Sequence, residues 1–218
     1  MRLRAAQVPV AISCPCMRIN YKGYSEVLQF ASSMKMSAQT DFIMMGKQNC
    51  DTSNLCNRLT LEETRKLLED VILKAVPMNS EYFSPSKNEQ MLSSDEWRGQ
   101  KVCGACVNSL CLSADGEYYP CAGFAGVPLG NCYKDTLRHV WLESEATKRI
   151  RAVTGDSFGK CAECKDRDYC SVCMCRNFNE TGDMLKPAEY FCKVAAINHE
   201  VVDEKQRQMI KAAKRGIL

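Results

Sequence analysis

The chain has 218 residues, which is enough for one or two compact domains with a hydrophobic core. Its 29 Lys and Arg residues nearly balance its 26 Asp and Glu residues, and the formal net charge of +3 does not indicate a nucleic-acid or membrane partner. No apolar run is long enough to span a bilayer, and the first apolar stretch is interrupted at Gln7 and Pro9, which makes it a poor signal peptide, so we expect a cytoplasmic protein.

The first part of the chain alternates predicted strands and helices. Residues 8–20 are predicted to form a buried strand that ends at Pro15, and residues 24–36 are predicted to form a helix. Residues 40–46 are apolar and are predicted to form a second short strand. This order of strand, helix and strand indicates parallel β/α units.

The next helix is predicted to begin at Thr60, because Thr60 and Glu63 have the spacing of a capping box. Two such units can neither close a barrel nor cover both faces of a sheet, so residues 1–76 are interpreted as the last part of a larger β/α domain. The apolar positions expected to face its core are Val27, Leu28, Ala31, Met34, Leu67, Leu68, Val71 and Ile72.

The middle of the chain is polar and is followed by a cysteine-rich part. Residues 77–102 are predicted to be a linker with a short helix near Asp95. Residues 103–192 hold eleven of the fifteen cysteines, and residues 193–218 are predicted to form a terminal helix with a basic end. One further helix is predicted over residues 135–153, with these core positions: Leu137, Val140, Trp141 and Ile150.

Cysteine is the unusual component of this sequence. Disulfides are not expected without secretion, because the cytosol keeps thiols reduced, so metal or cluster ligation is the leading explanation. The second of two groups has the spacing C-x2-C-x5-C-x2-C-x-C, which is tighter than that of zinc ribbons, and the chain has only two histidines. The spacing therefore favours iron–sulfur clusters, and a non-catalytic zinc-binding interaction module is the alternative. The two groups are Cys103, Cys106, Cys111 and Cys121, and then Cys161, Cys164, Cys170, Cys173, Cys175 and the distant Cys192.

A tight turn is predicted at Asp115 and Gly116, between two short strands. This turn would bring Cys121 back to Cys103 and Cys106. Not every cysteine is expected to be a ligand. Cys111 and Cys132 stand where apolar residues would serve and are expected to be small core residues. The cysteines without a recognised partner spacing are expected to be core or loop residues: Cys14, Cys16, Cys50 and Cys56.

The motif C-x12-G-x4-C from Cys103 through Gly116 to Cys121, followed by C-x2-C-x5-C and by Cys192, resembles the SPASM domain. The segments "SADGEYYPC", "PLGNCYKDTLRHVW" and "ETGDMLKPAEYFC" also resemble that family, which is the C-terminal extension of many radical S-adenosylmethionine enzymes that modify peptides. The resemblance implies two [4Fe–4S] clusters. It implies Cys103, Cys106, Cys121 and Cys173 as ligands of the first cluster, with Cys175 as the alternative to Cys173, and Cys161, Cys164, Cys170 and Cys192 as ligands of the second.

The resemblance also covers the first part of the chain, which looks like the closing units of a radical S-adenosylmethionine barrel. The expected fold is an α/β remnant of a partial TIM-like barrel, with about two β/α units, then a small α+β cysteine-rich SPASM domain and a C-terminal helix. The catalytic motif C-x3-C-x2-C of such enzymes is absent, since no two cysteines of the 218 residues are four apart.

The resemblance therefore implies that S-adenosylmethionine and a peptide or protein substrate bind only to a full-length form, or to an assembly in which a separate chain supplies the missing half of the barrel. This chain alone is not expected to start radical chemistry. Sulfatase-maturing relatives carry Asp directly after the cysteine that matches Cys121. Ala122 stands there in this chain, which favours another peptide modification.

Overall fold

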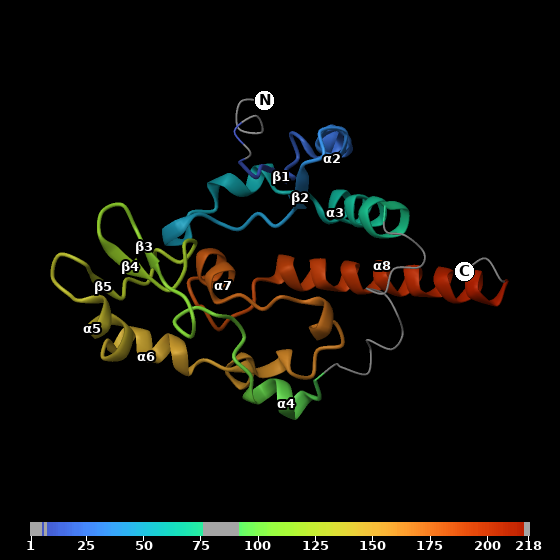
Figure 1. Cartoon of the computed structure of the whole chain (residues 1–218). Coiled ribbons are helices and arrows are strands. Elements are labelled where there is room, and N and C mark those ends of the chain that lie inside the picture. The colour runs from blue at the N-terminus through green and yellow to red at the C-terminus, as the bar shows by residue number, and fades with distance from the viewer. Residues whose placement is uncertain (1–5, 7, 76–91, 216–218) are drawn as a thin grey trace.

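The computed structural model describes residue 6, residues 8–75 and residues 92–215. Figure 1 shows a mixed α/β molecule in which the long helix α8 runs beside α3, with α7 near the N-terminal end of α8. In the described part, no helix is long and apolar enough to cross a membrane. The helices and strands are β1 (Ala11–Pro15), α2 (Tyr24–Ser33), β2 (Ser37–Asp41), α3 (Leu61–Leu68), α4 (Ser94–Gly99), β3 (Cys111–Leu112), β4 (Glu117–Tyr119), β5 (Gly130–Asn131), α5 (Leu137–Leu142), α6 (Glu145–Ala152), α7 (Met174–Thr181) and α8 (Glu189–Lys214).

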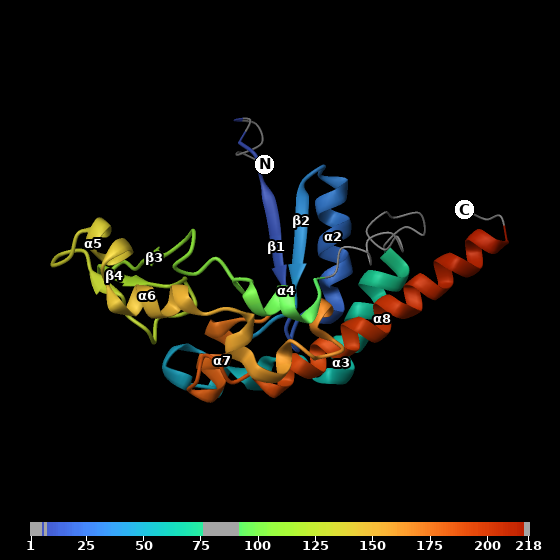
Figure 2. The same ribbon diagram turned by 90° about the horizontal axis from the view of Figure 1, so that it is seen from below.

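The N-terminal unit is a parallel β/α arrangement, as predicted. Strands β1 and β2 pair in parallel from Ala11 opposite Ser37 to Pro15 opposite Asp41, and α2 connects them. Helix α2 lies along the same side of both strands in Figure 2. The prediction that β1 is buried was wrong, because it alternates: Cys14 is buried, whereas Ala11, Ser13 and Pro15 are exposed.

The second strand was predicted at residues 40–46, and this was also wrong. Strand β2 occupies Ser37–Asp41, where five residues pair with β1. The apolar residues after it leave the sheet and pack elsewhere, since Phe42 contacts the core clusters around Leu67 and Leu68 and Met45 contacts the cysteine-rich part. The apolar residues after Asp41 therefore pack against helices and do not pair in a sheet.

Helix α3 begins as the sequence predicted. The Thr60 hydroxyl accepts a hydrogen bond from the Glu63 backbone N–H at 3.1 Å, and the Glu63 carboxylate accepts one from the Thr60 N–H at 2.8 Å. A π-helical turn over Glu69–Ala75 continues it. The predicted stripe faces inward, because Leu68 and Ile72 form a core cluster with α8 through Ile197, Val201 and Val202.

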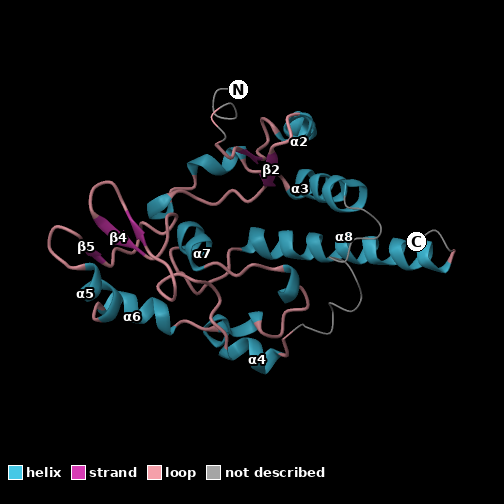
Figure 3. Cartoon of the chain, in the orientation of Figure 1, coloured by secondary structure: helices cyan, strands magenta, loops and turns pink. Residues whose placement is uncertain are grey.

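The cysteine-rich part contains a second small sheet, of antiparallel order β3, β4, β5, which Figure 3 shows apart from the parallel pair. The predicted tight turn is present: Gly116 has a φ of +88°, and its N–H donates to the Ser113 carbonyl at 3.1 Å. The predicted helix near Asp95 is α4, which Ser93 and Glu96 cap reciprocally.

The single helix predicted over residues 135–153 is two helices, α5 and α6. The helix is interrupted at Ser144, whose hydroxyl donates a hydrogen bond to the Leu129 carbonyl at 3.0 Å. Val140 and Ile150 are buried as predicted, Trp141 is half-buried, and Leu137 is 55% exposed, so its assignment to the core was wrong.

The terminal helix was predicted to follow Cys192, but α8 starts at Glu189 and carries Cys192 in its first turn. The polar segment predicted as a linker is described only from residue 92 onward, and residues 76–91 lie outside the described residues, as do residues 1–5 and 7.

Candidate metal centre

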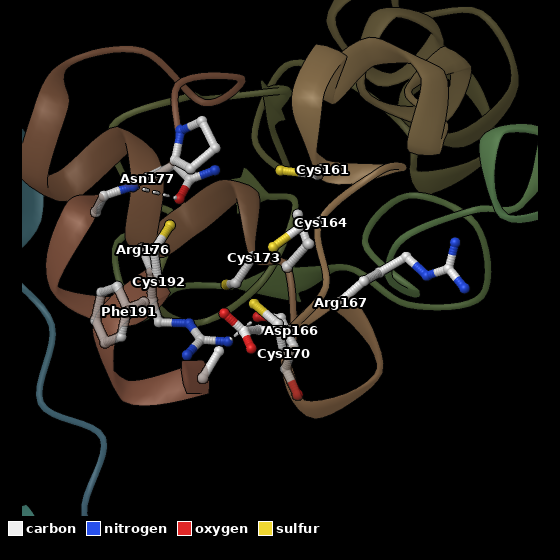
Figure 4. Close-up of a pocket in the computed structure, with 15 residues that line it drawn as sticks. Cys161, Cys164, Asp166, Arg167, Cys170, Cys173, Arg176, Asn177, Phe191 and Cys192 are labelled. Atoms are coloured by element: carbon white, nitrogen blue, oxygen red, sulfur yellow. Dashed lines mark hydrogen bonds between the residues drawn. The ribbon is translucent and has the colours of Figure 1, made fainter. Parts of the chain in front are cut away.

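The four thiols Cys161, Cys164, Cys170 and Cys192 line one pocket. In Figure 4 their sulfur atoms are drawn around the same space. Cys161 and Cys164 lie in a tight turn, in which the Cys164 N–H donates to the Cys161 carbonyl at 3.2 Å. Cys170 directly follows the 3-10 turn Arg167–Tyr169. Cys192 reaches the pocket from the first turn of α8. The sequence-predicted second ligand set is therefore brought together in space.

Burial makes three of these thiols resist ionisation. Burial is the larger cause and the neighbouring Cys192 thiol the next, and together they raise the pKa of Cys170 to about 11. Burial likewise raises the pKa of Cys161 and of Cys192, again with neighbouring thiols adding to the effect. Four thiolates can share this pocket only if a cationic centre replaces their protons, which is how metal binding couples to pKa.

The second gathering of thiols lies around Cys103, Cys106 and Cys121. The Cys106 side chain is fully buried, and its backbone has a φ of +58°, held by a hydrogen bond of 2.8 Å from its N–H to the Ser109 carbonyl. Burial raises the pKa of Cys106 to about 11, while the charge of Arg151 opposes this. Burial also raises the pKa of Cys103, and the thiols of Cys173 and Cys121 add to that effect. The first predicted set is also a spatial group.

Cys173 and Cys175 are in the second group by sequence spacing, but in the structure they lie with Cys103 and Cys121 of the first group. Cys173 is the N-cap of α7, and Cys175 lies in its first turn with 3% exposure. A hydrogen bond from the Cys175 thiol lowers the pKa of Cys121 to about 6 and the pKa of Cys173 to about 5, and the pKa of Cys175 itself rises. Cys173 also lines the pocket of the other group. The first group therefore contains five thiols, whereas a four-iron cluster takes only four cysteine ligands.

The Cys175 sulfur has further neighbours that the sequence did not reveal. It lies 3.7 Å from the Met45 sulfur, which comes from the segment after β2, and 3.8 Å from the Asn179 amide nitrogen one turn along α7. Asn179 also donates to the carbonyls of Gly46 and Gly123 at 3.1 and 3.2 Å. The N-terminal unit therefore contacts the first thiol group directly.

The other thiols stay outside the two groups. Cys14 and Cys16 are buried in the N-terminal core, and Cys50 and Cys56 are exposed in the loop after β2, as expected. Cys111 is half-buried on β3. Cys132 is exposed, so its assignment to the core was wrong: it comes directly after β5, a strand at the edge of the small sheet.

A buried ion pair holds the elements that present the thiols. The Arg58 guanidinium lies 2.7 Å from the Glu180 carboxylate on α7, and the two side chains are only 12% and 9% exposed. The same guanidinium stacks 3.9 Å from the centre of the Tyr190 ring on α8 and donates to the Met44 carbonyl at 3.3 Å. One arginine therefore joins the N-terminal unit to α7 and α8. Arg58 and Glu180 are separated by 122 residues, so no local pattern signals their pairing.

Each thiol group fits an iron–sulfur cluster in the chemistry of its donors. Cluster irons are held by cysteine thiolates, and each group supplies at least four from separate parts of the chain. Among the described residues, no three His, Cys, Asp or Glu side chains converge closely enough to hold a single metal ion.

The comparisons with known proteins agree with this chemistry. Residues 103–174 match SPASM, described as an iron–sulfur cluster-binding domain. A search of the curated proteins finds no match. Among solved structures, the chain is similar to a histidine-tagged anSMEcpe with bound AdoMet, with a TM-score of 0.60 and 16% identity over 98% of this chain and 57% of that one.

Two further solved structures share the fold. Native anSMEcpe with bound AdoMet has a TM-score of 0.55 and 16% identity over 97% of this chain and 59% of that one. Native anSMEcpe with bound AdoMet and Kp18Cys peptide has a TM-score of 0.56 and 15% identity over 98% of this chain and 60% of that one. The chain thus spans less than two thirds of the length of each of these structures, and identities this low establish likeness of fold.

Proposed function

We propose that this chain, whose residues 103–174 carry a SPASM iron–sulfur cluster-binding domain, binds two [4Fe–4S] clusters as the C-terminal part of a radical S-adenosylmethionine enzyme that modifies peptides or proteins. The observation that carries the proposal is the gathering of its thiols into two separate groups, one around the pocket of Cys161 and Cys192 and one around Cys106 and Cys121.

The ligand sets follow from these groups. Cys161, Cys164, Cys170 and Cys192 would hold the second cluster. Cys103, Cys106, Cys121 and Cys173 would hold the first, and Cys175 would donate its single S–H to one ligand sulfur or replace Cys173. Bound clusters of this kind supply one-electron transfer. The protein's own contribution is to hold the thiolates of both groups and to exclude water from the first group, which the burial of Cys106 and Cys175 supports.

The peptide-modifying role draws on the solved structures. One of the two native anSMEcpe structures contains the Kp18Cys peptide as well as AdoMet, and nearly all of the present chain shares its fold. By this analogy, a form of the present protein that includes an S-adenosylmethionine site would act on a peptide. Cytoplasmic location fits this proposal, because the cytosol keeps cysteine thiols reduced and so available as ligands.

The test is anaerobic reconstitution of the 218-residue chain with iron and sulfide. We expect a brown protein with about eight irons and about eight sulfides per chain, as two four-iron clusters require. Cys192→Ala should remove four irons and Cys121→Ala the other four, whereas the exposed Cys132→Ala should remove none. A colourless protein that instead binds zinc stoichiometrically would contradict the proposal and support the zinc-binding interaction module.

A further inference from the structure

The loop between Cys164 and Cys170 is attached to the helix that carries Cys192. The imidazole Nδ1 of His199 on α8 donates to the Asp166 carboxylate in this loop at 2.8 Å. The His199 ring stacks on the Tyr169 ring with a centroid separation of 4.2 Å and an angle of 11°. The neighbouring Asn198 amide donates to the Tyr169 carbonyl at 3.4 Å. The middle of the loop is therefore held by consecutive residues of α8.

The position of His199 along α8 gives these contacts a consequence for the thiols. His199 follows Cys192 by seven residues, which is close to two turns of an α-helix, so both side chains project from the same face. Asp166 lies between the two thiols that the loop presents and lines the same pocket (Figure 4). The contact of His199 with Asp166 thus joins the loop that carries Cys164 and Cys170 to the helix that carries Cys192.

The His199 ring is itself held from its other side. Its Nε2 lies 3.5 Å from the Asp203 carboxylate, one turn further along α8. The His199 and Asp166 side chains are 25% and 12% exposed, so their hydrogen bond is largely shielded from competing water. The half-buried His199 ring thus has a partner at each nitrogen and the Tyr169 ring against its face. These three contacts fix its orientation.

We propose that His199 is a positioning residue for the second cluster: from α8 it fixes the loop of Cys164 and Cys170 opposite Cys192 through its Nδ1 hydrogen bond to Asp166. This inference rests on the proposed function, since it assigns the pocket to a cluster. It goes further by naming a residue that is not a ligand but determines whether the four thiols can hold four irons at once. Outer partners of this kind typically change metal affinity by about 10- to 100-fold.

Three substitutions separate the hydrogen bond from the ring. His199→Asn keeps an N–H donor at the position of Nδ1, because its amide nitrogen is the same number of bonds from the backbone. His199→Gln places its amide nitrogen at the position of Nε2, toward Asp203 and away from Asp166. His199→Phe keeps the stack on Tyr169 but has no donor. His139→Asn is the matched control, since the other histidine of the chain is exposed on α5 beside Glu143.

The experiment reconstitutes each full chain anaerobically and follows iron release to a chelator and the electron paramagnetic resonance spectrum of the reduced clusters. In His199→Gln and His199→Phe we expect four of about eight irons to leave about tenfold faster than in the wild type, with an altered signal from one cluster only. His199→Asn should restore both readouts, and His139→Asn should match the wild type. Far-ultraviolet circular dichroism reports whether each variant is folded.

The outcomes distinguish this inference from the proposed function. A wild-type chain that loads about four irons or only zinc would refute the two-cluster proposal itself. A wild-type chain with about eight irons, together with unchanged release and spectra in His199→Gln and His199→Phe, would refute the role of His199 alone. Failure of His199→Asn to restore the signal, with its fold intact, would show that the donor to Asp166 does not position the loop.

Discussion

Truncation of Glu180 should destabilise the whole molecule more than its single charge would suggest. The Glu180 carboxylate pairs with Arg58 at 2.7 Å in a site where both side chains are nearly buried. Removing one partner of a buried pair leaves the other charge uncompensated, which costs about 3–5 kcal/mol. Arg58 would retain the Met44 carbonyl and the Tyr190 ring, so we expect a loss in the free energy of unfolding near the lower limit, about 3 kcal/mol for Glu180→Ala.

The size of the chain converts this free energy into a temperature. For 150–250 residues, each 1 kcal/mol lowers Tm by about 2–4 °C, so Glu180→Ala should lower Tm by about 6–12 °C. The assay is thermal unfolding of the anaerobically reconstituted protein, followed by circular dichroism, with the iron content of each variant measured first. Glu180→Gln should fall between the wild type and Glu180→Ala, because its amide can still accept the hydrogen bonds of Arg58 and of the Gly46 N–H.

The matched control is Glu62→Ala, which removes the ion pair with Lys66 on α3. That pair has a similar separation of 2.8 Å, but its side chains are 77% and 63% exposed, so Tm should not change measurably. Equal decreases in Tm for Glu180→Ala and Glu62→Ala would refute the reasoning, because burial would then not decide the strength of the pair. A double-mutant cycle with Arg58→Met would confirm that the loss comes from this interaction.

Three further predictions concern the ligands, the backbone and the chemistry. By iron analysis, Cys173→Ala should lower the iron content by about four per chain, whereas Cys175→Ala should retain about eight irons. The opposite pattern would make Cys175 the ligand. Gly155→Ala should lower Tm, because an added Cβ would lie 2.3 Å from the Trp97 carbonyl oxygen. Gly23→Ala is the control and should leave Tm unchanged, because no atom lies within 4 Å of its added Cβ. Equal Tm values for the two variants would contradict the crowding at Gly155. The 218-residue chain with both clusters loaded should form no 5′-deoxyadenosine from S-adenosylmethionine under dithionite, since none of its cysteines are four apart; repeated turnover in an anaerobic chromatographic assay would contradict this.

The features that the sequence predicted correctly are those decided by neighbouring residues. The turn at Gly116 and the caps at Thr60 and Ser93 each depend on a few consecutive positions, and all three are present. The closeness of Cys161 and Cys164 also follows from spacing, since a short turn brings the two thiols of a C-x2-C pair together. The place of Cys173 beside Cys103 does not follow from spacing, and only the family resemblance implied it.

The features that sequence reasoning missed depend on distant contacts. The apolar run after β2 was predicted as a strand because its partners on α3, α8 and α7 could not be identified from local pattern. The helix break at Ser144 depends on the Leu129 carbonyl, which a helical periodicity does not reveal. The pairing of Asp166 with His199 joins residues 33 positions apart and has no motif. Contacts of this kind become visible only once the chain is folded.

The placement of Cys192 in the first turn of α8 decides where the protein can be shortened. A fragment that ends directly after Cys192 would leave this cysteine on a helical stub of four residues, far below the length at which an isolated helix persists in water. The stub would also lack Ile197, Val201 and Val202, which pack against α3. A fragment intended to isolate the cysteine-rich part therefore has to extend beyond Val202, and it then carries an apolar helix face that α3 covers in the intact chain.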